Sequence, residues 1–391
     1  MWLVTRQGES FSLDGTIIHS HPNEAARRLC LGIRRVGFRD RSEHQCHLRS
    51  FCNYELPKSA TNLAFGTECN EAHERFHEAC DFREAYENIR PTRSSVNSLA
   101  MSPDDVFVTI GVPTYNNART IRRALDSVRA QSYTQWRLII SDDGSKDDTV
   151  SIAQKYAQED SRITVVSQPT NLNYGNFRYL VGRATTPYFA FLAGDDWMEP
   201  DFLEEALLVL VAAPEVVAAV PGVLMHPEGK EPYRSPATKS LEGSAEERFA
   251  SYIRDPGDNS RMYGLFRTEV ARKSFPDRNY HAYDWTFSAR SLLHGTHRQL
   301  PRVLLHREVT SFRNYLEYAR RDSKVWLFQI FPVLQMTLDL GREQRIRSST
   351  SSLRALASLN WMKHEQIVSE FYPNWGRIYR VLRRACRSLF S

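Results

Sequence analysis

Residues Pro187 to Pro200 read PYFAFLAGDDWMEP, and this stretch decides the fold. It contains an apolar run from 188 to 193, which stops at Gly194 with two carboxylates directly after it, Asp195 and Asp196. A continuous apolar run of this length predicts a strand buried on both faces, as in a parallel α/β sheet. Ligands in such sheets lie at the carboxyl ends of the strands, where adjacent carboxylates are costly to bury unpaired. Because hard oxygen ligands suit Mg²⁺ or Mn²⁺, the stretch predicts a divalent cation site; the alternative is a turn whose two solvated Asp residues cap the next helix.

Strands and helices alternate on both sides of this stretch. In chain order the predicted elements are the strand 106–112, the helix 118–131, the strand 136–140, the helix 148–159, the strand 163–166, the helix 175–184, the strand 188–193, a helix from 200 to 212 and the strand 216–220. Apolar residues recur at helical spacing in the helices, and short apolar runs mark the strands. This alternation predicts an α/β fold with a doubly wound, mostly parallel sheet flanked by helices.

A second pair of acids, Asp142 and Asp143, follows the strand 136–140 in the turn SDDGSKDD. The ends of neighbouring parallel strands face one crevice, so both acid pairs are expected at the same edge of the sheet. A carboxylate accepts hydrogen bonds from ring N–H or hydroxyl groups, and Gly144 allows close approach of the backbone, so this turn suits a base or a ribose. An Asx turn with a helix cap is the structural alternative. The first turn, GVPTYNN, is not the G-x-G-x-x-G of a dinucleotide-binding fold.

Composition narrows the class of protein. The chain has 391 residues, of which 41% are hydrophobic and 25% charged, as in ordinary soluble proteins. A formal charge of +5 does not by itself indicate a nucleic-acid partner. The longest apolar stretches are short and interrupted at Pro214, and the first residues lack a basic region followed by an apolar one. Neither a spanning helix nor a signal peptide is predicted, so we expect a cytoplasmic location.

Residues 1–100 differ from the rest of the chain. They hold five of the six cysteines and six of the twelve histidines, yet few apolar runs of period 2 or 3.6, which predicts a weakly ordered extension. Met101, just before the first strand, is a candidate functional start. A zinc site is the alternative, although no pair has Cys-x-x-Cys spacing, and a disulfide framework is not expected in a cytosolic chain. The candidate ligands form two groups: His44, Cys46, His47 and Cys52; and Cys69, His73, His77 and Cys80.

Three motifs in order carry a resemblance: IGVPTYNNARTIRRALDSVRAQSY, WRLIISDDGSKDDT and PYFAFLAGDDW. They resemble the nucleotide-sugar-binding half of family 2 glycosyltransferases with the GT-A fold, closely over 106–224 and more loosely to 313. The third motif has GDD where many relatives have ADD or DDD. The resemblance implies that Pro113 and Tyr115 line the nucleotide pocket and that Asp143 contacts the base, usually uracil. It also implies that Asp195 and Asp196 act as the DxD-like pair, the second reaching the metal and the first the ribose or diphosphate.

Two further site residues come from the less regular segment after 225. Residues 226–258, rich in Pro, Gly, Glu and Ser, predict a loop that folds over the donor and then a short helix, followed by a strand at 262–267. Asp284 opens a helix, where an Asp alone is normally a cap, but the resemblance implies the general base. His306 ends a strand predicted at 302–305; the resemblance implies that it approaches the diphosphate or metal, although a single His at a strand end is often structural.

The last 77 residues, 315–391, are predicted as helices broken near Gly341, 348–352 and Pro373. The final segment, 375–390, predicts a basic amphipathic helix with an apolar face and a face of five arginines. Such a helix docks on the catalytic domain or lies on an anionic membrane, and the unbalanced arginines favour peripheral contact with a membrane.

Together these predictions divide the chain into an extension at 1–100, a GT-A domain at 101–313 and a helical region at 314–391. The domain itself divides into a nucleotide-sugar half (101–225) and an acceptor half (226–313). The expected activity is inverting, metal-dependent transfer of a sugar from a nucleoside diphosphate sugar, with UDP favoured, to a glycan or lipid-linked acceptor in cell-envelope assembly. The absence of Q-x-x-R-W and of membrane spans favours a non-processive enzyme. A nucleotidyltransferase and a catalytically inactive nucleotide-sugar-binding module are the alternatives.

Overall fold

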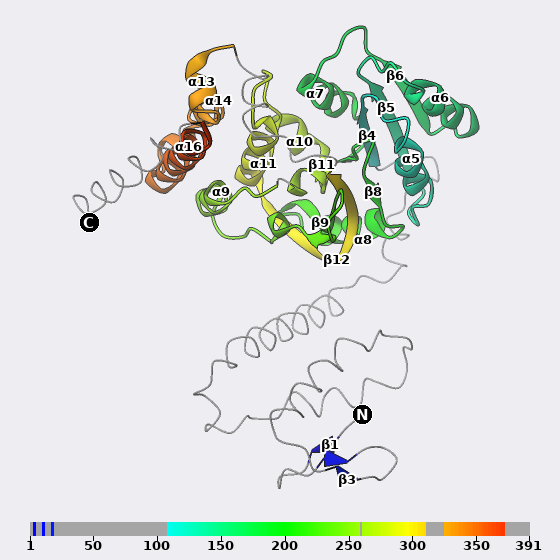
Figure 1. Ribbon diagram of the computed structural model, residues 1–391, viewed down its shortest axis with the longest axis horizontal. Helices are drawn as coiled ribbons and strands as arrows, with labels where there is room; N and C mark the ends of the chain where they lie inside the picture. The colour runs from blue at the N-terminus through cyan, green and yellow to red at the C-terminus, as the bar shows by residue number, and fades with distance from the viewer. Residues whose placement is uncertain are drawn as a thin grey trace, which may run out of the picture. The chain divides into compact units, whose positions relative to one another are not determined.

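The computed structural model describes residues 108–258, 260–309 and 324–371, together with three two-residue strands near the N-terminus (Figure 1). The chain divides into two compact units, 1–76 and 77–391. In the first unit β1 (Leu3–Val4), β2 (Ser10–Phe11) and β3 (Ile17–Ile18) form an antiparallel sheet. The candidate zinc ligands, the predicted boundary at residue 100 and the predicted helix at 375–390 lie outside the described residues.

The second unit is built on one nine-stranded sheet. Its order is β6-β5-β4-β7-β11-β9-β12-β8, with β10 paired to β9. The strands are β4 (Val108–Thr114), β5 (Trp136–Asp142), β6 (Ile163–Ser167), β7 (Tyr188–Phe191), β8 (Trp197–Met198), β9 (Val216–Pro227), β10 (Tyr233–Arg234), β11 (Leu265–Arg267) and β12 (Thr296–Val309).

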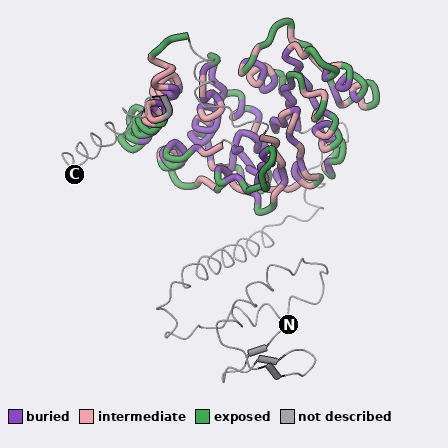
Figure 2. Tube along the Cα trace, in the orientation of Figure 1, coloured by how far each residue is buried: buried purple, intermediate pink, exposed green. Residues whose placement is uncertain are grey.

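The strands β6, β5, β4 and β7 are parallel, as the alternating pattern predicts. Every residue of β4 is buried, because it lies between β5 and β7 with helices packed against the sheet. The helices of this half are α5 (Ile121–Arg129), α6 (Thr149–Glu159), α7 (Tyr174–Arg183) and α8 (Phe202–Ala212). Their apolar faces and the sheet share one buried core, drawn in purple in Figure 2. The predicted α/β class is confirmed.

The other half of the sheet is mixed. β11 pairs antiparallel with both β7 and β9, whereas β9 and β12 run parallel to each other over most of their length. β12 is much longer than the strand predicted at 302–305, since it continues through His306 to Val309. Polar residues weaken strand propensity there, but pairing with β9 extends the ladder. The extension brings Arg307 and Glu308 into the sheet.

Helices after 225 build a second core, except that the helix at 268–274 packs into the sheet core. The longer ones are α9 (Ala245–Arg254), α10 (Thr268–Ser274), α11 (Tyr283–His294), α14 (Leu334–Leu340) and α16 (Thr350–Phe371). The short elements are η2 (Pro236–Thr238), η3 (Ser260–Tyr263), α13 (Trp326–Ile330) and α15 (Gln344–Arg347). α9 matches the predicted short helix and starts at a capping box of Ser244 and Glu247. Its apolar face packs with α11, α14 and α16, which gather around one another in Figure 1. Among the described helices, none is long and apolar enough to cross a bilayer.

Candidate active site

The loops that follow β4 and β5 are joined by hydrogen bonds at the carboxyl edge of the sheet. The backbone N–H of Asn116 donates to Ser145 Oγ (2.8 Å), and the N–H of Lys146 donates to Asn116 Oδ1 (2.8 Å). Asn116 has a φ of 54°, in the left-handed region that Asn tolerates better than most residues. These bonds fix the two loops relative to each other, as a preformed ligand site requires.

Pro113 and Tyr115, the predicted nucleotide-pocket residues, differ in exposure. Pro113 is buried inside β4, whereas the side chain of Tyr115, just beyond the strand, is 48% exposed. An exposed aromatic ring at a strand end offers a face for stacking. Of the two residues, Tyr115 is therefore the one that can contact a ligand.

The adjacent acids Asp142 and Asp143 have different partners. Asp142 Oδ2 accepts hydrogen bonds from the N–H groups of Gly144 (3.1 Å) and Ser145 (3.0 Å), which forms the Asx turn. Asp143 reaches across to the start of α7, where Oδ1 accepts from the Leu172 N–H (2.6 Å) and Oδ2 from the Asn173 N–H (2.8 Å). Burial raises the pKa of Asp143, and these two N–H groups oppose the rise. Asp142 therefore stabilises the turn after β5, and Asp143 connects this turn to the start of α7.

The two carboxylates after β7 are set by a close approach at Gly194. A Cβ atom at this position would lie 2.9 Å from both Thr114 Oγ1 and Asn117 Oδ1, so only glycine fits there without a shift. The hydroxyl of Thr120 donates to the Gly194 carbonyl (2.9 Å). The β4 loop and α5 therefore hold the backbone from which Asp195 and Asp196 project.

Asp196 points into the protein. It is 1% exposed, and its Oδ2 accepts from Arg307 Nε (3.2 Å) while its Oδ1 accepts from the Glu308 N–H (3.1 Å). Burial raises the pKa of Asp196 to about 7, although Arg307 acts in the opposite direction. Both partners come from the end of β12, beyond the predicted strand.

Asp195 is partly buried, and its carboxylate has no part in the Arg307 pair. Burial raises its pKa; the nearby Glu308 raises it further, while Arg307 and Arg123 lower it. Asp196 already pairs with Arg307, whereas the Asp195 carboxylate forms no ion pair with a described residue. Asp195 is therefore the acid of this pair with room for a cation.

His306 occupies a different environment from the one expected. Its Nδ1 lies 3.0 Å from His226 Nε2, and its Nε2 lies 2.9 Å from Glu199 Oε1. Its ring stacks on Trp197, with centroids 4.8 Å apart and planes 4° from parallel. Because both ring nitrogens are engaged within the protein, this arrangement leaves neither for a metal ion.

Arg123 and Glu308 are site residues that the sequence analysis missed. Arg123 Nη2 lies 2.7 Å from Glu308 Oε1 and donates to the Asp195 carbonyl (2.8 Å). Its guanidinium also lies over the Trp197 ring, 3.8 Å from the centroid. Strand alternation places Glu308 on the same face of β12 as His306, a signal that a longer predicted strand would have provided.

Asp284 lies in the first turn of α11, and its Oδ1 accepts from the Trp285 N–H (2.9 Å). The residue that starts this helix, Ala282, has a φ of 63°, a strained value for alanine. Burial raises the pKa of Tyr263, and Asp195, Asp196 and Asp284 all contribute to the rise. The predicted base thus lies within electrostatic reach of the same tyrosine as the carboxylate pair.

Within the described ranges, no group of three or more His, Cys, Asp or Glu side chains is arranged to hold a metal ion. Mg²⁺ usually takes only one or two protein carboxylates and completes its shell with waters and substrate phosphates. Asp195 and Glu308 are near enough for Glu308 to raise the pKa of Asp195, so this donor set fits a metal that the substrate helps to hold.

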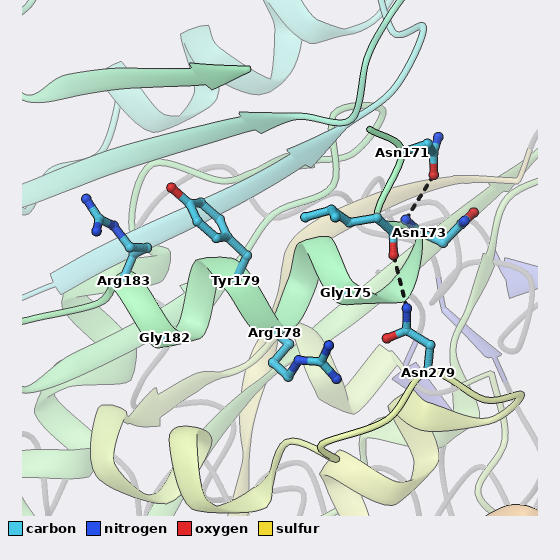
Figure 3. Close-up of a pocket in the computed structure, with 9 residues that line it drawn as sticks. Asn171, Asn173, Gly175, Arg178, Tyr179, Gly182, Arg183 and Asn279 are labelled. Carbon is cyan, nitrogen blue, oxygen red and sulfur yellow. Dashed lines mark hydrogen bonds between the residues drawn. The ribbon is translucent and has the colours of Figure 1, made fainter. Parts of the chain in front are cut away.

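A cavity of about 610 Å³ lies along α7, lined by residues of that helix, of the loop before it and by Asn279 (Figure 3). None of its lining residues is a member of the carboxylate pair or Asp284. The cavity and the acidic site are therefore distinct.

The comparisons with known proteins agree with the motifs. The family model for glycosyl transferase family 2 matches residues 109–275. The putative glycosyltransferase EpsH of Bacillus subtilis (strain 168) is 38% identical over 101 residues, 26% of this chain and 29% of the relative. The putative teichuronic acid biosynthesis glycosyltransferase TuaG of the same strain is 39% identical over 102 residues, 26% of this chain and 40% of the relative. The chain thus spans less than half the length of either relative.

Among solved structures, S. aureus TarS 1-349 in complex with UDP-GlcNAc aligns with a TM-score of 0.49 and 16% sequence identity. The alignment covers 68% of this chain and 73% of that chain.

Proposed function

Because residues 109–275 belong to glycosyltransferase family 2, we propose that this protein transfers a sugar from a nucleoside diphosphate sugar to an acceptor hydroxyl, with inversion at the anomeric carbon. The observation that carries the proposal is that the matched segment holds both acid pairs, Asp142 with Asp143 and Asp195 with Asp196, at the carboxyl edge of the parallel strands, where ligands of such sheets lie. The cell-envelope polysaccharide setting is suggested by the name of TuaG.

The nucleotide lies at the carboxyl edge of β4 and β5. Tyr115 stacks on the base, Pro113 closes the pocket from within the strand, and Asp143 accepts a hydrogen bond from a ring N–H. A carboxylate has lone pairs left after the Leu172 and Asn173 N–H groups are bound, so Asp143 can serve both partners. Uracil, with its ring N–H between two carbonyls, matches an acceptor at this position, which favours a UDP-sugar.

The diphosphate lies against Asp195. When bound, Mg²⁺ or Mn²⁺ stabilises the negative charge that develops on the leaving diphosphate. Asp195 and Glu308 would hold it, whereas Asp196 fixes Arg307 and the backbone of Glu308 from below. His306 supports the same segment of β12 through Glu199, His226 and Trp197.

Asp284 acts as the general base. It accepts the proton of the acceptor hydroxyl as that oxygen bonds to the anomeric carbon and the bond to the diphosphate breaks on the opposite face. The turn that holds Asp284 packs against α7, where Tyr174 stacks on Tyr283 with ring centroids 4.2 Å apart. A fixed carboxylate is favoured, since general-base catalysis depends on position.

The first experiment is a screen of nucleotide sugars with Mn²⁺ by thermal shift, followed by turnover assays on the sugars that stabilise the protein. Asp284→Asn is expected to lower turnover by roughly two to four orders of magnitude while donor affinity is retained. Asp255→Asn, an exposed carboxylate beyond α9, is the matched control and should leave both unchanged.

The products separate the alternatives. Donor hydrolysis that releases free sugar and nucleoside diphosphate supports the glycosyltransferase, whereas release of pyrophosphate from a nucleoside triphosphate would identify a nucleotidyltransferase. Donor binding with neither reaction would identify an inactive binding module. Loss of donor binding in Asp284→Asn would place that residue in the nucleotide pocket instead.

A glycan or lipid-linked acceptor is part of the proposal, as is peripheral contact with an anionic membrane through residues 375–390. The sequence of that segment has five arginines and no acid. Each arginine contributes on the order of 1 kcal/mol of binding free energy near an anionic surface. Sedimentation with anionic liposomes at low salt and release at high salt would support the contact. The proposed contact would be refuted if a variant sedimented with the liposomes as the native protein does after four arginines are changed to Glu: Arg380, Arg383, Arg384 and Arg387.

A further inference from the structure

The cavity along α7 has the size of a ligand site. Its volume of about 610 Å³ lies within the range of known small-molecule pockets. Figure 3 shows Gly175 and Gly182 on the face of α7 that lines the cavity, with Arg178 leaving the helix on one side and Tyr179 and Arg183 on the other.

Two glycines lie on this face of the helix: Gly175 is covered by Asn279, and Gly182 is open. Gly175 and Gly182 are seven residues apart, so they share one face two turns apart. A Cβ atom at Gly182 would meet no other atom within 4 Å, and its backbone is in the ordinary range. Gly182 is exposed and is the last residue but one of α7, so its open face is reached from solvent. An open backbone here leaves room for a ligand.

The lining carries positive charge without a compensating acid. Two arginines and no Asp or Glu contribute to it. Arg178 Nη1 donates to the carbonyls of Pro276 (3.3 Å) and Asp277 (2.5 Å), which ties α7 to the loop before α11. Arg183 is exposed and forms no hydrogen bond or ion pair with any described residue. The guanidinium of Arg183 is therefore available to an anion.

One end of the cavity lies beside the candidate active site. Its wall includes Leu172 and Asn173, whose N–H groups bind Asp143. The next residue, Tyr174, stacks on Tyr283, the neighbour of Asp284. From this end α7 runs about 15 Å to Arg183, at the usual rise of a helix. A chain whose end reaches Asp284 could therefore continue along α7.

We propose that this cavity binds the sugars of an acidic glycan acceptor that lie away from the reacting hydroxyl. The proposal rests on the proposed glycosyl transfer and adds the substrate class: an acceptor of several sugars that carries carboxylate or phosphodiester groups. Arg183 pairs with the anionic group, in the geometry that guanidinium offers to carboxylate and phosphate. The ring of Tyr179 and the Asn279 amide contact the sugar ring and its hydroxyls.

The test uses binding alone, with the full chain and no donor. The probes are oligogalacturonates of two to eight sugars, poly(glycerol phosphate) oligomers for the phosphodiester arm, and neutral maltooligosaccharides, each titrated calorimetrically. One of the two acidic series is expected to bind saturably, with affinity that rises with length, and at least tenfold more tightly than the neutral series. Gly182→Trp, which fills the hollow, and Arg183→Glu are each expected to weaken this binding at least tenfold.

Matched variants separate occupancy of the cavity from damage to the fold. Gln158→Trp places the same side chain on the exposed face of α6, and Gly182→Ala adds only a methyl group; both should bind the acidic oligomer as the native protein does. Thermal shift by UDP and Mn²⁺ should be the same in all four variants. If UDP and Mn²⁺ shift the melting temperature of neither the native protein nor any variant, the result counts against the proposed function and not against ligand binding in the cavity.

Three outcomes would overturn the inference. They are the absence of saturable binding of both acidic series at millimolar concentration, unchanged binding in Gly182→Trp, and displacement of the oligomer by UDP alone. The last would show that the cavity is part of the nucleotide pocket.

Discussion

The adjacent acids Asp195 and Asp196 have the same side chain but different surroundings in the fold. Both acids lie in the turn between β7 and β8, where Asp196 is directed toward β12 and Asp195 remains partly exposed. Asp196 forms a buried ion pair with Arg307, whereas the Asp195 carboxylate has no part in that pair. Position therefore decides which acid is paired within the protein, and we propose that the other faces the donor.

Substitution of each acid by asparagine should separate these roles. Asp196→Asn leaves Arg307 buried without its counter-charge and should lower the free energy of unfolding by about 3 kcal/mol. Asp195→Asn removes a carboxylate that takes no part in the Arg307 pair, so stability should be nearly unchanged, while turnover falls by roughly a hundredfold or more. Chemical denaturation and steady-state kinetics on both variants check this. Equal losses of stability would contradict it.

His297, which lies away from the candidate active site, should make the free energy of unfolding depend on pH. It is fully buried, and burial, with Arg261 and Arg248 nearby, holds its pKa well below 6.5. Below pH 6.5 the unfolded chain therefore binds a proton that the native protein does not. Stability from this group is complete above that pH and falls by up to about 1.4 kcal/mol per unit below it.

Denaturation curves at pH 7, 6 and 5 should show the decline, and His297→Gln should make it shallower. Leu304→Ala, a change to a buried apolar residue of β12, is the control; it should lower stability by about 2–5 kcal/mol without altering the slope with pH. A slope unchanged in His297→Gln would mean that other groups cause the decline.

At the scale of elements, β12 links the two halves of the site. Its alternation puts Arg307 on one face, toward Asp196, and His306 and Glu308 on the other, toward Trp197 and Arg123. A strand that ended at His306, as expected from local propensity, would leave Glu308 in a loop. The ladder with β9 therefore fixes the position of this carboxylate.

This arrangement predicts different outcomes for two residues of the same strand. Glu308→Gln should weaken Mn²⁺ binding in the presence of UDP by roughly tenfold or more, because a hard cation loses a charged ligand. His306→Asn should leave Mn²⁺ affinity unchanged and lower the melting temperature, because Glu199 and His226 lose their partner. Titration of Mn²⁺ followed by its spin-resonance signal measures both. Lost affinity in His306→Asn would restore the histidine as a metal ligand.

At the scale of the whole molecule, the two apolar cores found among the described residues are built from residues after 107. The sheet core begins at Val108, and the helical core extends from Phe249 on α9 to Leu359 on α16. Buried apolar area is the main source of folding stability, so these residues should fold without the preceding segment.

A chain that begins at Met101 should therefore keep the melting temperature and the donor affinity of the full-length protein. Thermal unfolding and donor titration of the truncated protein check this expectation. Insolubility of the truncated protein, together with stoichiometric zinc in the full chain, would contradict it.

The sequence by itself determined the family, the α/β class and the positions of the first strands and helices. The family predicted from three motifs is confirmed by the match over 109–275. These features follow from local information, because a buried parallel strand needs a continuous apolar run and a helix an apolar stripe. The acids at the ends of β5 and β7 could be located for the same reason.

Only the tertiary structure decided what each of these side chains touches. The antiparallel position of β11, the full length of β12 and the pairing of Asp196 with Arg307 join segments far apart in sequence. No periodicity records such pairings, because strand propensity depends on the neighbouring strand more than on the residue. For the same reason Arg123 carried no signal, and Glu308 could be located only with the full length of β12. His306 was expected at a metal, whereas its ring nitrogens lie against Glu199 and His226.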